Sequence, residues 1–152
     1  MRVMALDQSS NISGVCVLDD QQVTFYCKID LSKNKDVPDR IKHMFLEIVK
    51  LIEQYKPDLL VVEAVQQQTN AKTSMMLSQL QGGLICYAYE HNIPVVSPMP
   101  SQWRSKLDYK QGRAIKREQL KQQSFDYVKS RFGIECSEDE AEAIAIACAM
   151  SK

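Results

Sequence analysis

The sequence predicts one α/β domain in which three strands come first and β-α-β units follow. Its 152 residues are the size of a single domain, and its 45% hydrophobic residues are enough to form a buried core. Short apolar runs alternate with segments of helical periodicity, and no internal repeat or linker-like stretch interrupts them. This composition excludes a disordered tail, a collagen-like fibre and a disulfide-built miniprotein.

The first half of the chain predicts three strands and one helix. Residues 2–7 and 13–18 are short apolar runs separated by the polar turn DQSSNISG, and residues 22–30 alternate between apolar and polar. Together they predict an antiparallel meander. Apolar residues at helical spacing then predict an amphipathic helix over residues 39–55, which ends before Pro57.

The second half predicts the β-α-β units. Residues 58–63 (DLLVVE) are nearly all apolar, which is typical of a strand buried on both faces. After the polar stretch QQQTNAKTS, a second helix runs to about Tyr89, and IPVVS at residues 93–97 is the fifth strand. The remaining segments predict a short helix, a basic helix and a final helix, over residues 101–107, from about 114 to 132, and from about 138.

Charge is balanced overall but unevenly distributed along the chain. Nineteen basic and nineteen acidic residues cancel. However, residues 102–132 hold nine basic side chains against three acids, and residues 133–152 hold five acids against one lysine. A basic stretch followed by an acidic cluster fits an enzyme that binds a polyanion and holds cations where it cuts. Two solvated helix faces would give the same pattern, so charge alone leaves both interpretations open.

Cysteine usage and hydropathy predict a cytoplasmic protein. The five cysteines are odd in number and scattered without a C-x-x-C pair, as expected for reduced thiols. The two histidines lie far apart and neither pairs with a nearby cysteine, which argues against a structural zinc site. No apolar run approaches the roughly 20 residues needed to span a bilayer, and Met1 leads into a strand-like segment rather than a signal peptide.

Four carboxylates occupy positions where an acid is unexpected or paired. Asp7 and Glu63 close the first and fourth strands, and an unpaired charge after a buried run is costly. If these strands are adjacent and parallel, both acids emerge at the same carboxyl edge of the sheet. Asp139 and Glu142 are three residues apart at the start of the final helix, so they share one face.

Four such groups together would repel one another strongly, by roughly 4 kcal/mol for a pair 4 Å apart. Hard oxygen ligands of this kind suit magnesium or manganese, and two such ions can clamp an in-line phosphoryl displacement. Each acid alone has a simpler interpretation, because an acid can cap a helix, pair with a lysine or favour the helix dipole. Both interpretations stay open at this point.

Five motifs along the chain resemble those of a known family. They are RVMALDQSSNISG, LLVVEAVQQQTNAKTSMMLSQLQGG, IPVVSPMPSQWRSKL, GRAIKREQ and the terminal DEAEAIAIA. In order and spacing they are similar to the RuvC-type Holliday junction resolvases of the RNase H-like superfamily, over essentially the whole chain. The compact size and the departures described below look most like a phage-encoded branch, of the kind found in lactococcal phages.

The resemblance implies an RNase H-like fold with a five-stranded mixed sheet between helices, and a homodimer. It also implies magnesium-dependent nicking of two like-oriented strands at a four-way DNA junction, leaving 5′-phosphate and 3′-hydroxyl ends. By position, the metal-binding and catalytic acids would be Asp7, Glu63, Asp139 and Glu142. Lys116 falls on the family's basic residue near the scissile phosphate.

Two positions depart from the family pattern. The last acid is Glu142 where the family commonly has aspartate, and Glu140 is a poorer substitute because the i, i+3 spacing from Asp139 favours Glu142. Gln66 stands where bacterial members often place an aromatic wedge. Without base stacking of roughly 1–3 kcal/mol per base, we expect weak dependence on the cleavage sequence and broad acceptance of branched DNA.

Several other residues are candidates for DNA contact or packing. Besides Gln66, the expected phosphate contacts are Arg104, Lys106, Lys110, Arg113, Lys116, Arg117 and Lys121. Trp103 fits either a half-buried anchor or a stacking platform. Gly14 is predicted to lie in a tight strand turn, and Gly82 with Gly83 fits either a dimer interface or helix packing.

Three other functions remain compatible with these residues. Two are nucleases of the same superfamily, namely a monomeric YqgF-like RNA-processing enzyme and a flap nuclease. The third is a non-catalytic module that binds branched DNA and no longer assembles a metal site. Oligomeric state, a DNA and RNA substrate panel, and asparagine at Asp7 would discriminate among them.

Overall fold

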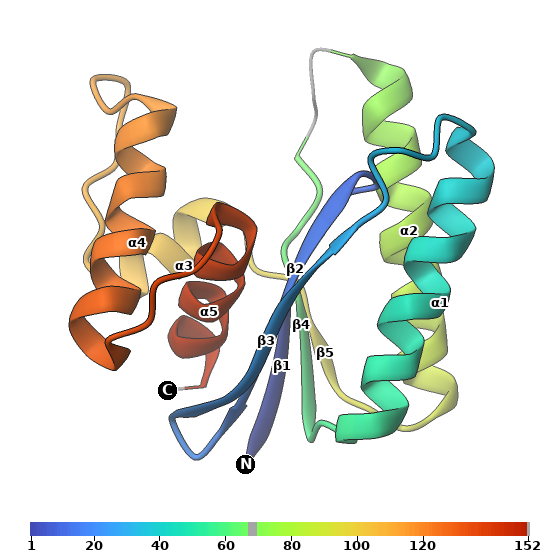
Figure 1. Ribbon diagram of the computed structural model, residues 1–152, viewed down its shortest axis with the longest axis horizontal. Helices are drawn as coiled ribbons and strands as arrows, with labels where there is room; N and C mark the ends of the chain where they lie inside the picture. Colours follow the sequence, from blue (N-terminus) through green and yellow to red (C-terminus); the bar gives the residue numbers. More distant parts are fainter. Residues whose placement is uncertain (67–69, 152) are drawn as a thin grey trace.

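The structure is a computed structural model that describes residues 1–66 and 70–151. In this part of the chain a five-stranded mixed sheet lies between two layers of helices (Figure 1). The strand order is β3-β2-β1-β4-β5. Three antiparallel strands followed by two parallel ones is the fold class that the sequence predicts, so that prediction is confirmed.

The first three strands form the expected meander. β1 (Arg2–Asp7) pairs antiparallel with β2 (Ile12–Asp19), which pairs antiparallel with β3 (Gln22–Asp30). Asp20 and Gln21 join the last two strands and both have positive φ, of 45° and 72°. Two such residues fit the primed turns whose twist matches that of a hairpin.

The parallel half of the sheet contains a short strand that is buried on both faces. β4 (Leu59–Val62) pairs parallel with β1, and the short β5 (Val95–Val96) pairs parallel with β4. Val61 packs into the core on one face of the sheet, while Leu60 and Val62 pack into the core on the other. All three are fully buried. The run LLVV is therefore the doubly buried strand that its composition predicts.

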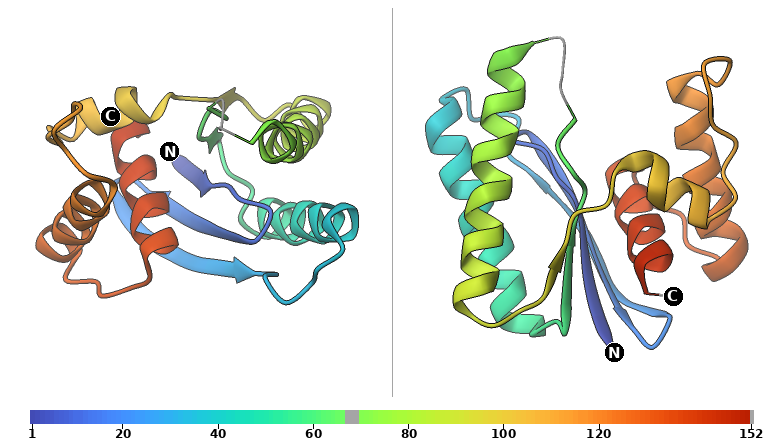
Figure 2. Two further views of the ribbon diagram at one scale, coloured as in Figure 1. Left: turned by 90° about the horizontal axis from the view of Figure 1, so that it is seen from above. Right: turned by 180° about the vertical axis from the view of Figure 1, so that it is seen from behind.

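Helices cover the two faces unequally (Figure 2). α1 (Val37–Tyr55) and α2 (Ala71–Glu90) lie on one face. α3 (Pro100–Lys106), α4 (Arg117–Phe132) and α5 (Glu138–Met150) lie on the other. On this second face α5 lies against the strands and α4 packs outside it.

Close packing of α5 against the sheet explains Gly14. From Ala141 onward α5 is almost entirely buried, with small side chains that allow a short distance between helix and strand. Gly14 lies inside β2, directly opposite Asp7, and a Cβ there would lie 1.9 Å from the carbonyl oxygen of Asp139. The prediction of a tight turn at Gly14 was therefore wrong, because close approach by α5 is what requires glycine there.

The basic helix begins later than its sequence predicts. α4 starts at Arg117 rather than near residue 114. Gly112 has a φ of +121°, a conformation that favours glycine. Lys116 is the extended residue preceding the helix, and its backbone N–H donates to the Gln119 side chain at 2.8 Å.

The described residues also bear on disulfide bonding and on membrane-spanning helices. None of the five cysteines, all of which lie in the described ranges, forms a disulfide, as expected of thiols. Among the helices described, none is long and apolar enough to cross a membrane.

Candidate active site

The four acids singled out from the sequence line the same pocket, which has a volume of about 570 Å³. Asp7 is the last residue of β1 and Glu63 follows β4 directly. Because Leu6 pairs with Val62 in parallel register, both acids leave the sheet at one edge. The first two turns of α5 bring Asp139 and Glu142 to the same place.

A side-chain cap fixes the first turn of α5. Glu140 accepts hydrogen bonds from the backbone N–H of Ser137 at 2.8 Å and from its hydroxyl at 2.6 Å. This capping contact occupies Glu140 and keeps it out of the pocket lining. Asp139 and Glu142, the pair that the i, i+3 spacing favours, both line the pocket, together with Glu138.

Burial and mutual repulsion raise the pKa values of these carboxyl groups. Burial is the largest cause for Asp7, whose pKa lies well above its usual value, and the charges of Glu142, Glu63 and Asp139 raise it further. Burial is likewise the main reason why the pKa values of the other three acids are raised. Several buried carboxylates that repel one another are costly to ionise together, and a bound cation would stabilise their ionised forms.

Two side chains of α3 hold two of the acids. The indole Nε1 of Trp103 donates to Oε1 of Glu63 at 2.6 Å. The Arg104 guanidinium lies 3.6 Å from Oε1 of Glu142, and both side chains are less than one-fifth exposed. Each contact lowers the pKa of the acid it holds, against the effect of burial. Trp103 itself is fully buried, so it is an anchor and cannot stack on DNA from this position.

The donor set fits divalent cations in its chemistry. Its four carboxylates are hard oxygen ligands. The other three raise the pKa of Asp7 through their charges. As they stand, no three His, Cys, Asp or Glu side chains in the described ranges are arranged to hold an ion. Glu63 and Glu142 are instead engaged by Trp103 and Arg104, each through one carboxylate oxygen.

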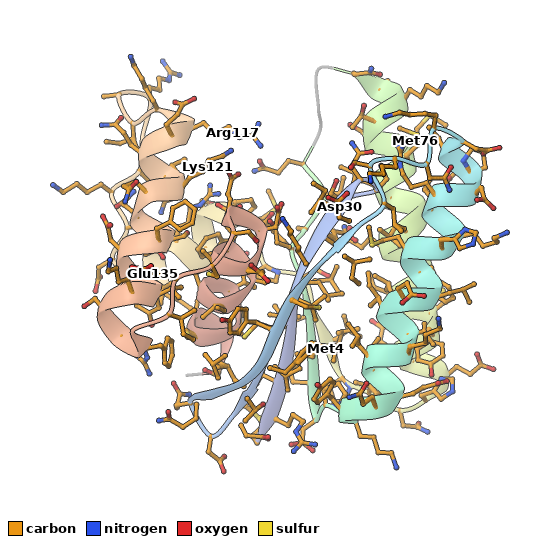
Figure 3. The ribbon with its side chains drawn as sticks, viewed as in Figure 1. Met4, Asp30, Met76, Arg117, Lys121 and Glu135 are labelled. Atoms are coloured by element: carbon orange, nitrogen blue, oxygen red, sulfur yellow. The ribbon has the colours of Figure 1, made fainter. Side chains whose placement is uncertain are left out.

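The predicted basic residues divide into two groups. Arg104, Arg117 and Lys121 line the pocket, and Figure 3 shows Arg117 and Lys121 projecting from the side of α4 that faces the sheet. Lys121 also forms an ion pair with Glu138. The second group is exposed and lies outside the pocket lining; it consists of Lys106, Lys110, Arg113 and Lys116.

Gln66 is exposed and lines the pocket where the chain leaves β4. The two glutamines that follow it lie outside the described residues. Before it, Gln81 of α2 holds the backbone: its side-chain oxygen accepts from Val65 N–H and its amide donates to the Glu63 carbonyl, both at 3.3 Å. Sequence reasoning missed Gln81, because nothing in its helical position signals a contact 16 residues away.

Sequence reasoning also missed Gln8 as a residue of the pocket. It follows Asp7 and lines the pocket, yet both polar atoms of its side-chain amide are buried and find no hydrogen-bond partner among the described residues. Unpaired buried polar groups are costly and uncommon in folded proteins. No sequence pattern distinguishes such a glutamine from an ordinary polar loop residue.

Comparison with known proteins identifies the family of this site. The family model described as "Crossover junction endodeoxyribonuclease RuvC" matches residues 3–150. The chain belongs to the RuvC family. The RuvC resolvase of Trichlorobacter lovleyi is 30% identical over 154 aligned positions, which cover 97% of this chain and 83% of that protein. Against the RuvC resolvase of Methylococcus capsulatus identity is 29%, over 62% of this chain and 58% of the relative.

Solved RuvC structures share the fold. The structure of Thermus thermophilus RuvC in complex with a Holliday junction substrate superposes with a TM-score of 0.79 at 16% identity. The superposition covers 99% of this chain and 93% of the other. The RNase H-like fold implied by the resemblance is therefore the fold of this RuvC-family chain.

Proposed function

We propose that this RuvC-family chain is a metal-dependent, structure-selective endonuclease that nicks four-way DNA junctions and other branched DNA. The observation that carries the proposal is the pocket, where Asp7 and Glu63 lie with three acids of α5 beside three basic side chains. Acids that attract cations and bases that attract phosphates are the two requirements of phosphodiester hydrolysis. The products would carry 5′-phosphate and 3′-hydroxyl ends.

Magnesium is the expected cofactor, with manganese as a substitute. Asp7, Glu63, Asp139 and Glu142 would hold the metal, with two ions as the expected number. Bound metal supplies an activated water and charge stabilisation at the leaving oxygen. Glu142, one methylene longer than the family's aspartate, would reach the pocket from the second turn of α5.

The basic side chains would bind and orient the DNA backbone. Arg117 and Lys121 face the acids from α4, so a phosphate drawn to them would lie next to the carboxylates. Lys116 precedes Arg117 and, with the exposed Lys106, Lys110 and Arg113, would extend phosphate contacts away from the pocket. Such contacts position DNA without reading its sequence, and Gln66 offers no aromatic ring for stacking.

A homodimer is part of the proposal, because resolving a junction requires two nicks in like-oriented strands. The outer face of α2 supports it: Met75 and Tyr89 are 65% and 66% exposed, unusual for large apolar side chains. Gly82 has open space around it, whereas Gly83 packs against Phe45 of α1. Gly82 is therefore the better candidate for an intermolecular contact. The enzyme would act in the cytoplasm, that of the bacterial host if it is phage-encoded.

The decisive experiment incubates the purified protein with a synthetic four-way junction, with and without magnesium, and maps the nicks. Symmetric paired nicks that require magnesium are expected. Cuts confined to flaps or to RNA would favour the other nucleases of the superfamily. An Asp7→Asn variant should lose nicking and keep junction binding, whereas a wild type that binds junctions and never nicks them would be a binding module.

A further inference from the structure

We infer that Trp103 is a positioning residue that presents the Glu63 carboxylate to the metal. This inference rests on the proposed function and deepens it. Its basis is the hydrogen bond of 2.6 Å from the Trp103 indole to Oε1 of Glu63, which connects the buried core beneath α3 to a pocket-lining acid at the end of β4. Neither the charge pattern nor the family resemblance assigned Trp103 this contact.

The indole is held rigidly enough to act as a fixed donor. Trp103 is fully buried, and its ring meets the Tyr109 ring edge-on at a centroid distance of 5.7 Å. The Arg104 guanidinium lies 4.9 Å from the centre of the same ring. Packing on these sides leaves the indole little freedom to rotate, so its N–H direction is set by the fold.

The contact has a defined chemical effect on Glu63. An indole N–H can only donate, so it favours the ionised, metal-binding carboxylate over the protonated acid. It engages one oxygen, and the backbone of Glu63 is held separately by the Gln81 amide at 3.3 Å. Side chain and main chain are therefore both oriented before a metal arrives, and such supporting partners are worth about 10- to 100-fold in metal affinity.

Trp103 is the single tryptophan of the chain, so its fluorescence reports directly on this contact. Magnesium binding at Glu63 would change the electrostatic environment of the indole and hence its emission. The signal needs no DNA and no cleavage. It therefore tests the contact separately from the activity of the metal-loaded enzyme.

The test compares the full-length wild type with Trp103→Phe, which keeps an aromatic ring and removes the N–H donor. Calorimetric titration with Mg²⁺ should show binding about 10- to 100-fold weaker in the variant. Nicking of a synthetic junction by the variant should recover as Mg²⁺ is raised. Tyr109→Phe, which alters the aromatic cluster without touching an acid, is the matched control and should keep wild-type affinity. Equal affinity in wild type and Trp103→Phe would overturn the inference.

Fluorescence keeps the inference testable if Trp103→Phe fails to fold. Wild-type emission should change with Mg²⁺, and a Glu63→Gln variant, which retains an acceptor but loses the charge, should lack that response. Unchanged wild-type emission while calorimetry registers binding would overturn the role of Trp103 and leave the proposed nuclease intact. A wild type that neither binds Mg²⁺ nor nicks junctions would overturn both.

Discussion

Replacing Gly14 with alanine should damage both stability and cleavage, by an amount that follows from one contact. The added Cβ would lie 1.9 Å from the Asp139 carbonyl oxygen, and ordinary contact begins at 3.4 Å, so the first turn of α5 must retreat by about 1.5 Å. Overpacking of this kind costs about 1–3 kcal/mol of unfolding free energy. The same retreat moves Asp139 and Glu142 away from Asp7, and a misplacement of about 1 Å can cost roughly 100-fold in rate.

Urea unfolding and timed nicking of a four-way junction would measure the two effects of Gly14→Ala. The matched control is Gly83→Ala, because Gly83 lies in α2 and a Cβ there would meet the Phe45 ring at 3.4 Å, an ordinary contact distance. Alanine at Gly83 should stabilise the helix by up to about 1 kcal/mol. If Gly14→Ala unfolds at the wild-type urea concentration and nicks at the wild-type rate, the close approach of α5 is not what places the acids.

Three further predictions concern charge and sequence preference. Without metal, Asp7→Asn should be more stable than wild type at neutral pH, because the folded state raises the pKa of Asp7 above its ordinary 3.8. That advantage should vanish below about pH 3.8, where the acid is protonated in both states; an advantage that persists there in acid denaturation curves would contradict it. Lys121→Ala should weaken junction binding and lower the salt slope by about one, whereas Lys50→Ala on the opposite face should change neither. Because Gln66 offers no aromatic ring for stacking on a base, junctions with varied central sequences should be nicked at similar rates, and strict dependence on one tetranucleotide would refute this.

Hydrophobic patterning predicted the fold well where a single physical rule decides the structure. A doubly buried strand must be apolar throughout, so LLVV identified β4, and the spacing of Met44, Ile48 and Ile52 identified the buried face of α1. The start of α4 was missed by three residues, because Gly112 and the extended Lys116 keep the preceding segment out of the helix. Helical propensity alone does not report such local backbone choices.

The acids of the site were predictable, and the groups that hold them were not. A carboxylate after a buried strand is conspicuous in sequence because it violates the pattern around it, and Asp7 and Glu63 both do so. By contrast, the Trp103 indole and the Gln81 amide act across 40 and 18 residues of sequence, through distances that only the folded chain defines. Gly14 was interpreted wrongly for the same reason, since its partner is the backbone of Asp139.

The placement of α5 determines when, during synthesis of the chain, the proposed nuclease site can be completed. Three of the five carboxylates that line the pocket, Glu138, Asp139 and Glu142, enter with this last described helix, which must dock onto strands formed by the first 19 residues. A nascent polypeptide still emerging from the ribosome would therefore hold Asp7 and Glu63 without their counterparts. DNA cleavage would therefore begin only after α5 has been synthesised and has docked, and an incomplete chain on the ribosome would not cut DNA.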